Sequence, residues 1–214
     1  MDESTTREKV LKKIRAALLS KSQNPFPKLD FESPVFVPTD EDLLVLFSDK
    51  LTAAGGKFFL IENELEFVEG MVDLGVYYKW KNIICTEDGL SNLLTECALP
   101  HSIDKDDLLE SNVSITTCEY LIAQTGSILL SSKHQSRAAA LFAPVHIVLA
   151  RASQLTLDLK EAIAKLRQAN PKMPSAISLI TGPSHTADIE GKLVTGAHGP
   201  QQLYCFVIDD REIA

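Results

Sequence analysis

Residues 177–207, ISLITGPSHTADIEGKLVTGAHGPQQLYCFV, combine two apolar runs with two glycine-proline turns. The first run, 177–180, ends just before Gly182-Pro183, where glycine permits positive φ and proline fixes φ, so the chain must turn. The second run, 203–208, follows Gly199-Pro200 and shows little alternation of apolar and polar residues. Short, continuous apolar runs are typical of strands that are buried on both faces. We therefore predict two buried strands with glycine loops at their ends.

The segment between these two strands is rich in polar residues. Hydroxyls, an imidazole and carboxylates follow one another over residues 184–190. Ser184 or Thr186 has the side chain of a helix N-cap, so we expect a short helix to begin at one of them.

The rest of the chain alternates between helical and strand patterns from Asp40 onward. A helix is expected from Leu43 until Gly55-Gly56 end it, and Asn63 is expected to cap the next helix, which runs to about Tyr77. Further expected helices are 90–98, 119–123, 137–142 and 157–168, and the expected strands are 57–61, 82–86, 113–116, 127–131, 145–150, 177–180 and 203–208. Repeated crossovers of this kind predict an α/β fold with an open, mostly parallel sheet covered by helices on both faces.

The N-terminal 38 residues differ in character from the rest. Residues 5–21 have apolar side chains at helical spacing, and Thr5 with Glu8 fits a capping box, which predicts an amphipathic helix with a basic polar face. Four prolines between residues 24 and 38 favour an extended arm. We expect two parts: a helix and proline-rich arm over 1–38, and one domain over 39–214.

Composition excludes several classes of function. With 21 basic and 29 acidic residues among 214, the formal charge is −8, which disfavours binding to nucleic acid or anionic lipid. The four cysteines are far apart in the sequence and match no cluster or zinc spacing, so no iron-sulfur cluster or zinc is expected on this chain. The longest apolar stretch, 138–150, is short and interrupted by Pro144, so we expect no membrane insertion and a cytoplasmic location.

Three glycine turns are the candidate ligand site. The carboxyl ends of parallel strands are where such sheets bind ligands, and the turns around Gly126, Gly182 and Gly199 are predicted to lie there. Their backbone amides and hydroxyls suit a carboxylate or phosphate, and Arg137 is a cation that could pair with it. The alternatives are that the glycines only shape turns and that Arg137 is a surface charge. The candidate ligand-binding residues are Thr125, Gly126, Arg137, Thr181, Gly182, Pro183, Ser184, Thr186, Asp188, Glu190, Gly196, His198 and Gly199.

A metal site and a catalytic triad are not indicated. His185, His198, Asp188 and Glu190 are possible metal ligands, but their spacing matches no known ligand pattern, so no metal is predicted. His146 lies within an apolar run and is interpreted as a hydrogen-bonded core histidine. The catalytic residues, if there are any, remain unknown from the sequence.

The segments GPSHTADIE at 182–190 and GAHGP at 196–200 resemble the signature of the LUD domain family. A T-G-S strand start at 125–127 and a P-V-H-I-V strand at 144–148 extend the resemblance, which covers about residues 39–209. The residue before Thr125 is commonly acidic in that family, whereas it is Gln124 here. The resemblance implies a fold similar to that of sugar-phosphate isomerases, coenzyme A transferases and formyltetrahydrofolate cyclo-ligases.

The same resemblance implies a function. It suggests a subunit of an iron-sulfur-dependent system that oxidises L-lactate to pyruvate, with the clusters on partner proteins and no cofactor on this chain. One alternative is an enzyme that binds a phosphorylated or nucleotide-type anionic ligand at the carboxyl-terminal edge of the strands. A second alternative is a structural scaffold with an empty pocket.

Overall fold

The structure is a computed structural model that describes residues 5–19, 26–28, 39–133, 138–189 and 192–211. It separates into two units, Met1–Pro38 and Thr39–Ala214. In the first unit, α1 (Thr6–Leu19) begins with a capping box, in which Thr5 N–H donates to Glu8 Oε2 at 2.9 Å and Glu8 N–H donates to Thr5 Oγ1 at 3.4 Å. The expected N-terminal helix is therefore confirmed, and none of its residues is buried.

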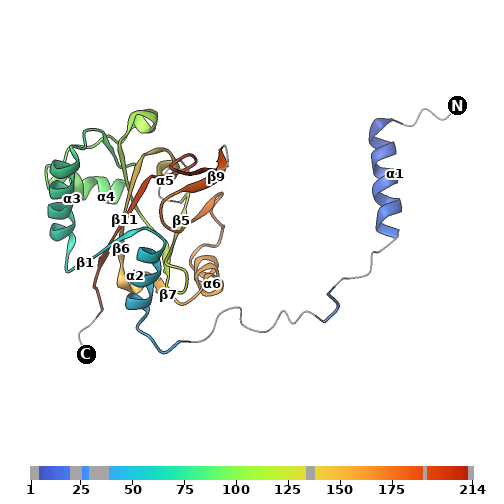
Figure 1. Ribbon diagram of the computed structural model, residues 1–214, viewed down its shortest axis with the longest axis horizontal. Helices are drawn as coiled ribbons and strands as arrows, with labels where there is room; N and C mark the ends of the chain where they lie inside the picture. Colours follow the sequence, from blue (N-terminus) through green and yellow to red (C-terminus); the bar gives the residue numbers. More distant parts are fainter. Residues whose placement is uncertain (1–4, 20–25, 29–38, 134–137, 190–191, 212–214) are drawn as a thin grey trace. The chain divides into compact units, whose positions relative to one another are not determined.

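Five parallel strands form the central sheet of the second unit, in the order β1-β11-β6-β3-β2 (Figure 1). This confirms the predicted parallel α/β sheet. The two central strands, β11 and β6, are buried along nearly their whole length, as their continuous apolar sequences predict. The strands are β1 (Lys57–Ile61), β2 (Ile83–Ile84), β3 (Val113–Thr117), β6 (Val145–Arg151) and β11 (Gln202–Ile208).

Helices α3 (Glu64–Tyr78) and α4 (Asp88–Glu96) pack on one face of this sheet. Asn63 caps α3 as expected, because its side-chain oxygen accepts hydrogen bonds from the N–H groups of Leu65 and Glu66. The buried Phe67 and Met71 place the apolar side of α3 against Phe206 and the other aromatic and aliphatic side chains of that face. Burial of each side chain of this size stabilises the fold by about 1.5–3 kcal/mol.

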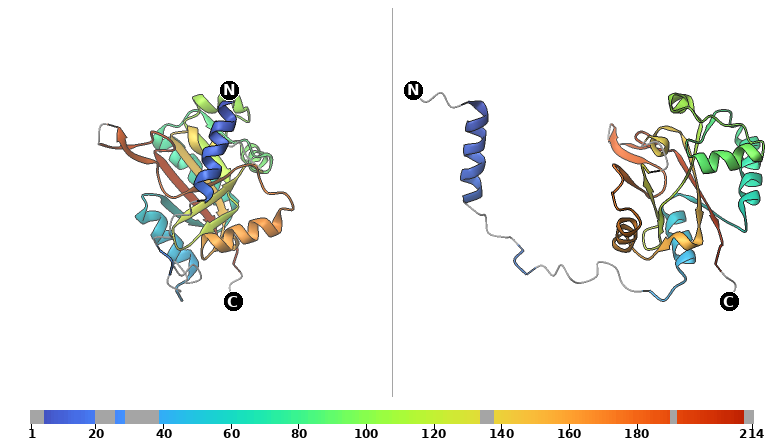
Figure 2. Two further views of the ribbon diagram at one scale, coloured as in Figure 1. Left: turned by 90° about the vertical axis from the view of Figure 1, so that its right-hand side faces the viewer. Right: turned by 180° about the vertical axis from the view of Figure 1, so that it is seen from behind.

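The opposite face of the parallel sheet is covered by α2 (Leu43–Ala53) and by a second sheet (Figure 2). The second sheet has the order β7-β4-β5-β8, and α6 (Leu159–Ala169) packs on its outer side through Ala162 and Leu166. Its strands are β4 (Tyr120–Ile122), β5 (Ser127–Ser131), β7 (Leu155–Thr156) and β8 (Ile177–Ile180), and the short α5 (Ala139–Phe142) precedes β6. The layers are therefore α3 and α4, the parallel sheet, α2 with the second sheet, and α6.

Two expected helices are wrong. Residues 119–123 form β4 instead, because Leu121 and Ile122 are fully buried on opposite faces of a strand that pairs with β5 across the turn at Gly126. The helix expected from Ser184 or Thr186 is β9 (His185–Ile189), which pairs antiparallel with β10 (Lys192–Thr195). In both cases cross-strand pairing overrides a local helix signal.

The strand β8 is real but is not part of the parallel sheet. It pairs antiparallel with β5 at the edge of the second sheet, where Ile177 and Leu179 are exposed and Ile180 is buried. The expectation that this strand is buried on both faces is therefore wrong, because an edge strand of a two-layer arrangement covers the core with one face only.

No helix among the described residues is long and apolar enough to cross a membrane.

Candidate functional site

Three hydroxyls from two loops meet where β5 begins and β8 ends. The antiparallel pairing of Ile128 with Ile180 brings the two loops together, so Thr125 Oγ1 lies 2.7 Å from Ser127 Oγ, which lies 2.6 Å from Thr181 Oγ1. Ser127 is buried. The predicted site residues Thr125 and Thr181 are thus joined through a hydroxyl that links both loops.

Gly126 and Gly182 bring these loops against the C-terminal half of α2. Their φ angles are +63° and +69°, in the left-handed region that favours glycine. A Cβ on Gly126 would lie 2.2 Å from the backbone nitrogen of Leu51, and one on Gly182 would lie 2.1 Å from the carbonyl oxygen of Ala54. The space beside these two glycines is therefore filled by the α2 backbone.

Ser184 connects the two signature segments through its backbone. Its N–H donates to the carbonyl oxygen of Pro200 at 2.8 Å, and its own carbonyl oxygen accepts from the N–H of Gly196 at 2.8 Å. A Cβ on Gly199 would lie 3.0 Å from the Ser184 Cβ. Residues 181–184 and 196–200, together with Thr125–Ser127, make one connected structure, which we call the glycine-loop region.

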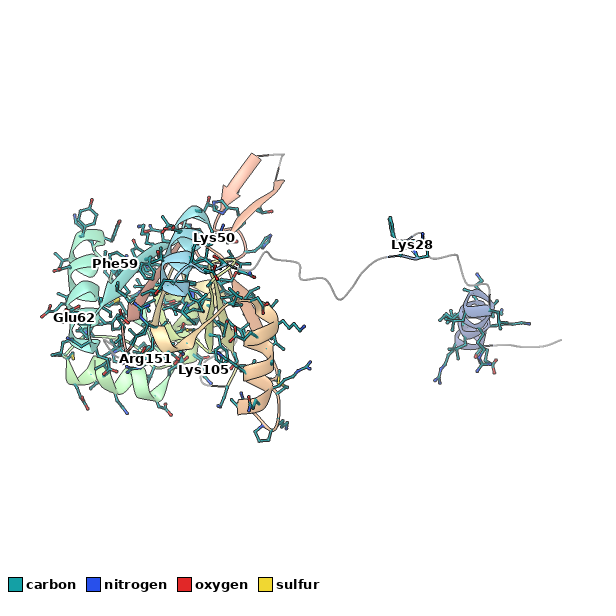
Figure 3. All side chains as sticks on the ribbon, turned by 90° about the horizontal axis from the view of Figure 1, so that it is seen from below. Lys28, Lys50, Phe59, Glu62, Lys105 and Arg151 are labelled. Atoms are coloured by element: carbon teal, nitrogen blue, oxygen red, sulfur yellow. The ribbon has the colours of Figure 1, made fainter. Side chains whose placement is uncertain are left out.

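The hairpin of β9 and β10 projects from the domain beyond the glycine-loop region (Figures 2 and 3). Thr186 lies in β9 opposite Val194, and Asp188 lies in the same strand. His198 is exposed in the turn after β10, and the half-buried Pro183 accepts a hydrogen bond at its carbonyl oxygen from His185 Nδ1 if that nitrogen carries the proton. Arg137 and Glu190 lie outside the described residues.

The placement expected for these loops is wrong. Gly196–Pro200 precedes β11 and so lies at the amino end of a parallel strand, whereas Thr125–Gly126 precedes β5 in the second sheet. The 181–184 loop follows the carboxyl end of β8 and the 125–126 turn follows that of β4, but both strands belong to the second sheet and are antiparallel to β5. The error came from assigning all strands to one parallel sheet. That the loops bind a ligand stays a prediction.

A cleft with a volume of about 650 Å³ lies at the true carboxyl edge of the parallel sheet, where β3, β6 and β11 end. This is the edge at which open α/β sheets bind ligands, and the volume is in the range of small-molecule sites. None of the predicted site residues that the structure describes lines this carboxyl-edge cleft. Its lining residues are Glu64, Glu87, Asp88, Gly89, Leu90, Leu93, Thr117, Cys118, Glu119, Lys133, Leu149, Ala150, Arg151, Gln154 and Ile208.

Glu87 is the most buried acidic side chain of the cleft, with 5% of its surface exposed. Its Oε1 accepts from the N–H of Thr117 at 2.8 Å and its Oε2 accepts from the Thr117 hydroxyl at 2.5 Å. Both carboxylate oxygens are thereby fixed between the end of β2 and the end of β3.

Glu119 and Cys118 follow β3 at the same edge. The Glu119 carboxylate accepts a short hydrogen bond from the Ser131 hydroxyl. Burial raises the pKa of the Cys118 thiol well above its usual range, so this sulfur remains protonated and is a poor nucleophile.

Two cations among the described residues also line the cleft. Arg151, the last residue of β6, donates from Nη2 to Glu64 Oε1 at 2.7 Å, and both side chains are about half exposed. The Lys133 ammonium makes no hydrogen bond or ion pair with any residue that the structure describes. The cleft therefore offers one unpaired cation and one cation in an exposed ion pair.

These cleft residues were missed because they are scattered over residues 64–208 and form no contiguous motif. The signal in the sequence was positional, since Glu87, Thr117 and Arg151 each directly follow a predicted strand. Among the described residues, no group of three or more histidine, cysteine, aspartate or glutamate side chains is arranged to hold a metal.

Comparison with known proteins identifies relatives. The model of the LUD domain matches residues 101–208, about half of the chain. Lactate utilization protein C of Bacillus subtilis strain 168 is 38% identical over 106 residues, which is 48% of this chain and 44% of that protein. Lactate utilization protein C of Shouchella clausii is 28% identical over 190 residues, covering 80% of this chain and 81% of that protein.

A solved structure supports the fold. A DUF162 family protein from Deinococcus radiodurans superposes with a TM-score of 0.56 at 17% identity, covering 78% of this chain and 96% of that chain. The matched LUD region includes the cleft residues from Thr117 to Ile208 but not Glu64 or Glu87. The cleft is thus built from that region and from the helices that precede it.

Proposed function

This chain belongs to the LUD domain family, and on that premise we propose that it is a subunit of a lactate utilization system that oxidises L-lactate to pyruvate. The observation that carries the proposal is similarity to a protein named Lactate utilization protein C over 80% of the chain. In this proposal the redox clusters belong to iron-sulfur partner proteins, and this chain contributes none.

The positions of the cysteines support a chain without clusters. Cys85 follows β2, Cys118 follows β3 and Cys205 lies within β11, while Cys97 ends α4. Burial raises the pKa of the Cys85 thiol to about 12 and that of Cys205 further still, so both sulfurs are protonated in the metal-free chain.

Affinity purification from lactate-grown cells tests this proposal. We expect cysteine-rich iron-sulfur proteins to co-purify, and the chain purified alone to be colourless, without stoichiometric iron or sulfide. If the isolated chain shows a visible absorbance band with matching iron and sulfide, the assignment of all clusters to partners is wrong. If no iron-sulfur protein accompanies it, the subunit proposal fails.

A second candidate function is binding of a small anionic ligand, and the carboxyl-edge cleft favours it. The carboxylates of Glu64, Glu87 and Glu119 already have hydrogen-bond partners, whereas Lys133 has none among the described residues. Asp88, exposed in the first turn of α4, is the remaining acid. The cleft therefore has unused donor capacity, which suits a carboxylate or phosphate. Such a ligand would fit either an enzyme or a ligand-regulated subunit.

Growth on lactate tests the second candidate. In a strain that lacks the gene, we expect Lys133→Gln to impair growth at normal protein level, because it removes a charge without removing a buried contact. The control is Lys165→Gln, which removes the charge of another exposed lysine. Lys165 pairs with Glu161 on α6, away from the cleft. If the two variants grow equally well, the cleft has no role in growth on lactate.

A further inference from the structure

A second cavity lies beside the carboxyl-edge cleft and shares three lining residues with it. This neighbouring cavity has a volume of about 340 Å³ and lies beside the end of β1, and its lining adds Glu62, Asn63 and Leu65. Glu64, Arg151 and Ile208 line both cavities. Figure 3 shows Glu62 and Arg151 on the same side of the domain.

The ion pair between Arg151 and Glu64 lies at the junction of the two cavities. Because both side chains are about half exposed, at 48% and 45%, solvent screens their attraction and little free energy is needed to separate them. The Glu64 contact is the only hydrogen bond that the Arg151 side chain donates within the described residues. A guanidinium has five N–H donors, so Arg151 can bind another acceptor beside Glu64 or in its place.

The combined space is much larger than lactate, which has six non-hydrogen atoms. Cavities of about 650 Å³ and 340 Å³ match ligands of drug size. The first cavity has the cations Lys133 and Arg151 together with four carboxylates, and three of these, all but the exposed Asp88, already accept hydrogen bonds. The second cavity shares Arg151 and adds oxygen acceptors, including the exposed carboxylate of Glu62. An anionic group fits the first cavity, and hydroxyl donors fit the second.

We propose that the two cavities hold one phosphorylated, hydroxyl-bearing compound of sugar-phosphate or nucleotide size, with its phosphate on Arg151 and Lys133. Glu64 competes with this phosphate for Arg151, so it limits binding of anions that are too short to gain contacts in the second cavity. The inference rests on the second candidate function and adds the class of ligand and the role of the ion pair.

Calorimetric titration of the full chain tests the ligand class. The probes are ribose 5-phosphate and AMP, with orthophosphate and L-lactate as short anions. We expect at least one of the two longer phosphates to bind about tenfold or more tightly than either short anion. If neither binds more tightly than orthophosphate, the two-part ligand is wrong; if only AMP does, the compound is of nucleotide size.

Two variants locate the site. Arg151→Gln should weaken binding of the longer phosphate about ten- to a hundredfold, because it removes hydrogen bonds to a charged group. Glu64→Gln should strengthen orthophosphate binding by up to about fivefold, since it removes a competing charge of an exposed ion pair. A purely structural role of the pair would not produce a gain. Lys165→Gln is the control and should leave every affinity unchanged.

The outcomes separate this inference from the second candidate function. If Lys133→Gln impairs growth on lactate but the longer phosphates bind no better than orthophosphate, the cleft functions and the ligand class is wrong. If Glu64→Gln leaves orthophosphate affinity unchanged or weaker while melting temperatures stay normal, the competitive role of Glu64 is overturned.

Discussion

The glycine-loop region and the carboxyl-edge cleft lie on different parts of one domain and differ in what their residues do. The loops carry the contiguous motifs of the family, yet Gly126 and Gly182 lie against the backbone of α2 and leave no room beside them. The cleft has open volume and unpaired charge but no contiguous motif. A recognisable motif can therefore mark a place where the fold is tightly constrained, while the ligand site is assembled elsewhere.

Substitution of a loop glycine should give the largest effect. We expect Gly182→Ala to lower the free energy of unfolding by about 2–5 kcal/mol, because the methyl group meets the Ala54 carbonyl oxygen and φ is positive. Gly89→Ala in α4, where a Cβ meets nothing within 4 Å, is the matched control and should change stability by about 1 kcal/mol or less. Urea denaturation measures both. If the two variants are equally stable, the glycine-loop region is not a constrained structure.

The second largest effect concerns His146, a buried histidine in β6. Its titration should change the free energy of unfolding less than Gly182→Ala does. His146 is fully buried, its Nε2 lies 2.9 Å from Thr116 Oγ1, and its Nδ1 has no hydrogen-bond partner among the residues that the structure describes. Burial lowers the pKa of His146 from its usual 6.5 to about 3. The imidazole is therefore neutral in the folded protein, as expected for a core histidine.

The sign of the pH dependence follows from that shift. Between pH 6.5 and 3 the unfolded chain binds a proton at His146 that the folded chain does not, so stability is lost as the pH falls through this window. From pH 7 to pH 5 the wild type should lose about 2 kcal/mol more than His146→Gln, which cannot titrate. Urea titrations of both proteins at the two pH values give this difference. Parallel losses would mean that His146 can bind a proton in the folded state.

The smallest expected effect concerns Ser184. Its backbone N–H and carbonyl join the two signature segments, so Ser184→Ala retains those bonds and should change the free energy of unfolding by less than about 0.5 kcal/mol. Thermal unfolding checks this expectation. Growth on lactate gives the sharper comparison, because a growth defect at normal protein level would show that the hydroxyl contacts a ligand. The glycine-loop region would then be a binding site as well as a structural one.

Local signals predicted most of the fold correctly. The strands β1, β5 and β8 have the expected bounds, and the caps of α1 and α3 use the expected residues. These features depend on interactions between residues that are close in the sequence. The two wrong helices, at β4 and β9, lie where strand pairing decided the structure.

The sequence alone determined the family, the alternation of helices and strands, the buried character of β6 and β11, and the lack of a cluster motif among the cysteines. Periodicity, capping and motif spacing are written in consecutive residues, so they can be found without a structure. Only the tertiary structure decided that β8 pairs antiparallel with β5 in a second, mixed sheet and that Glu64, Glu87, Lys133 and Arg151 line one cleft. The physical reason is that strand order and pairing register set which strand ends meet, and these depend on contacts between distant residues.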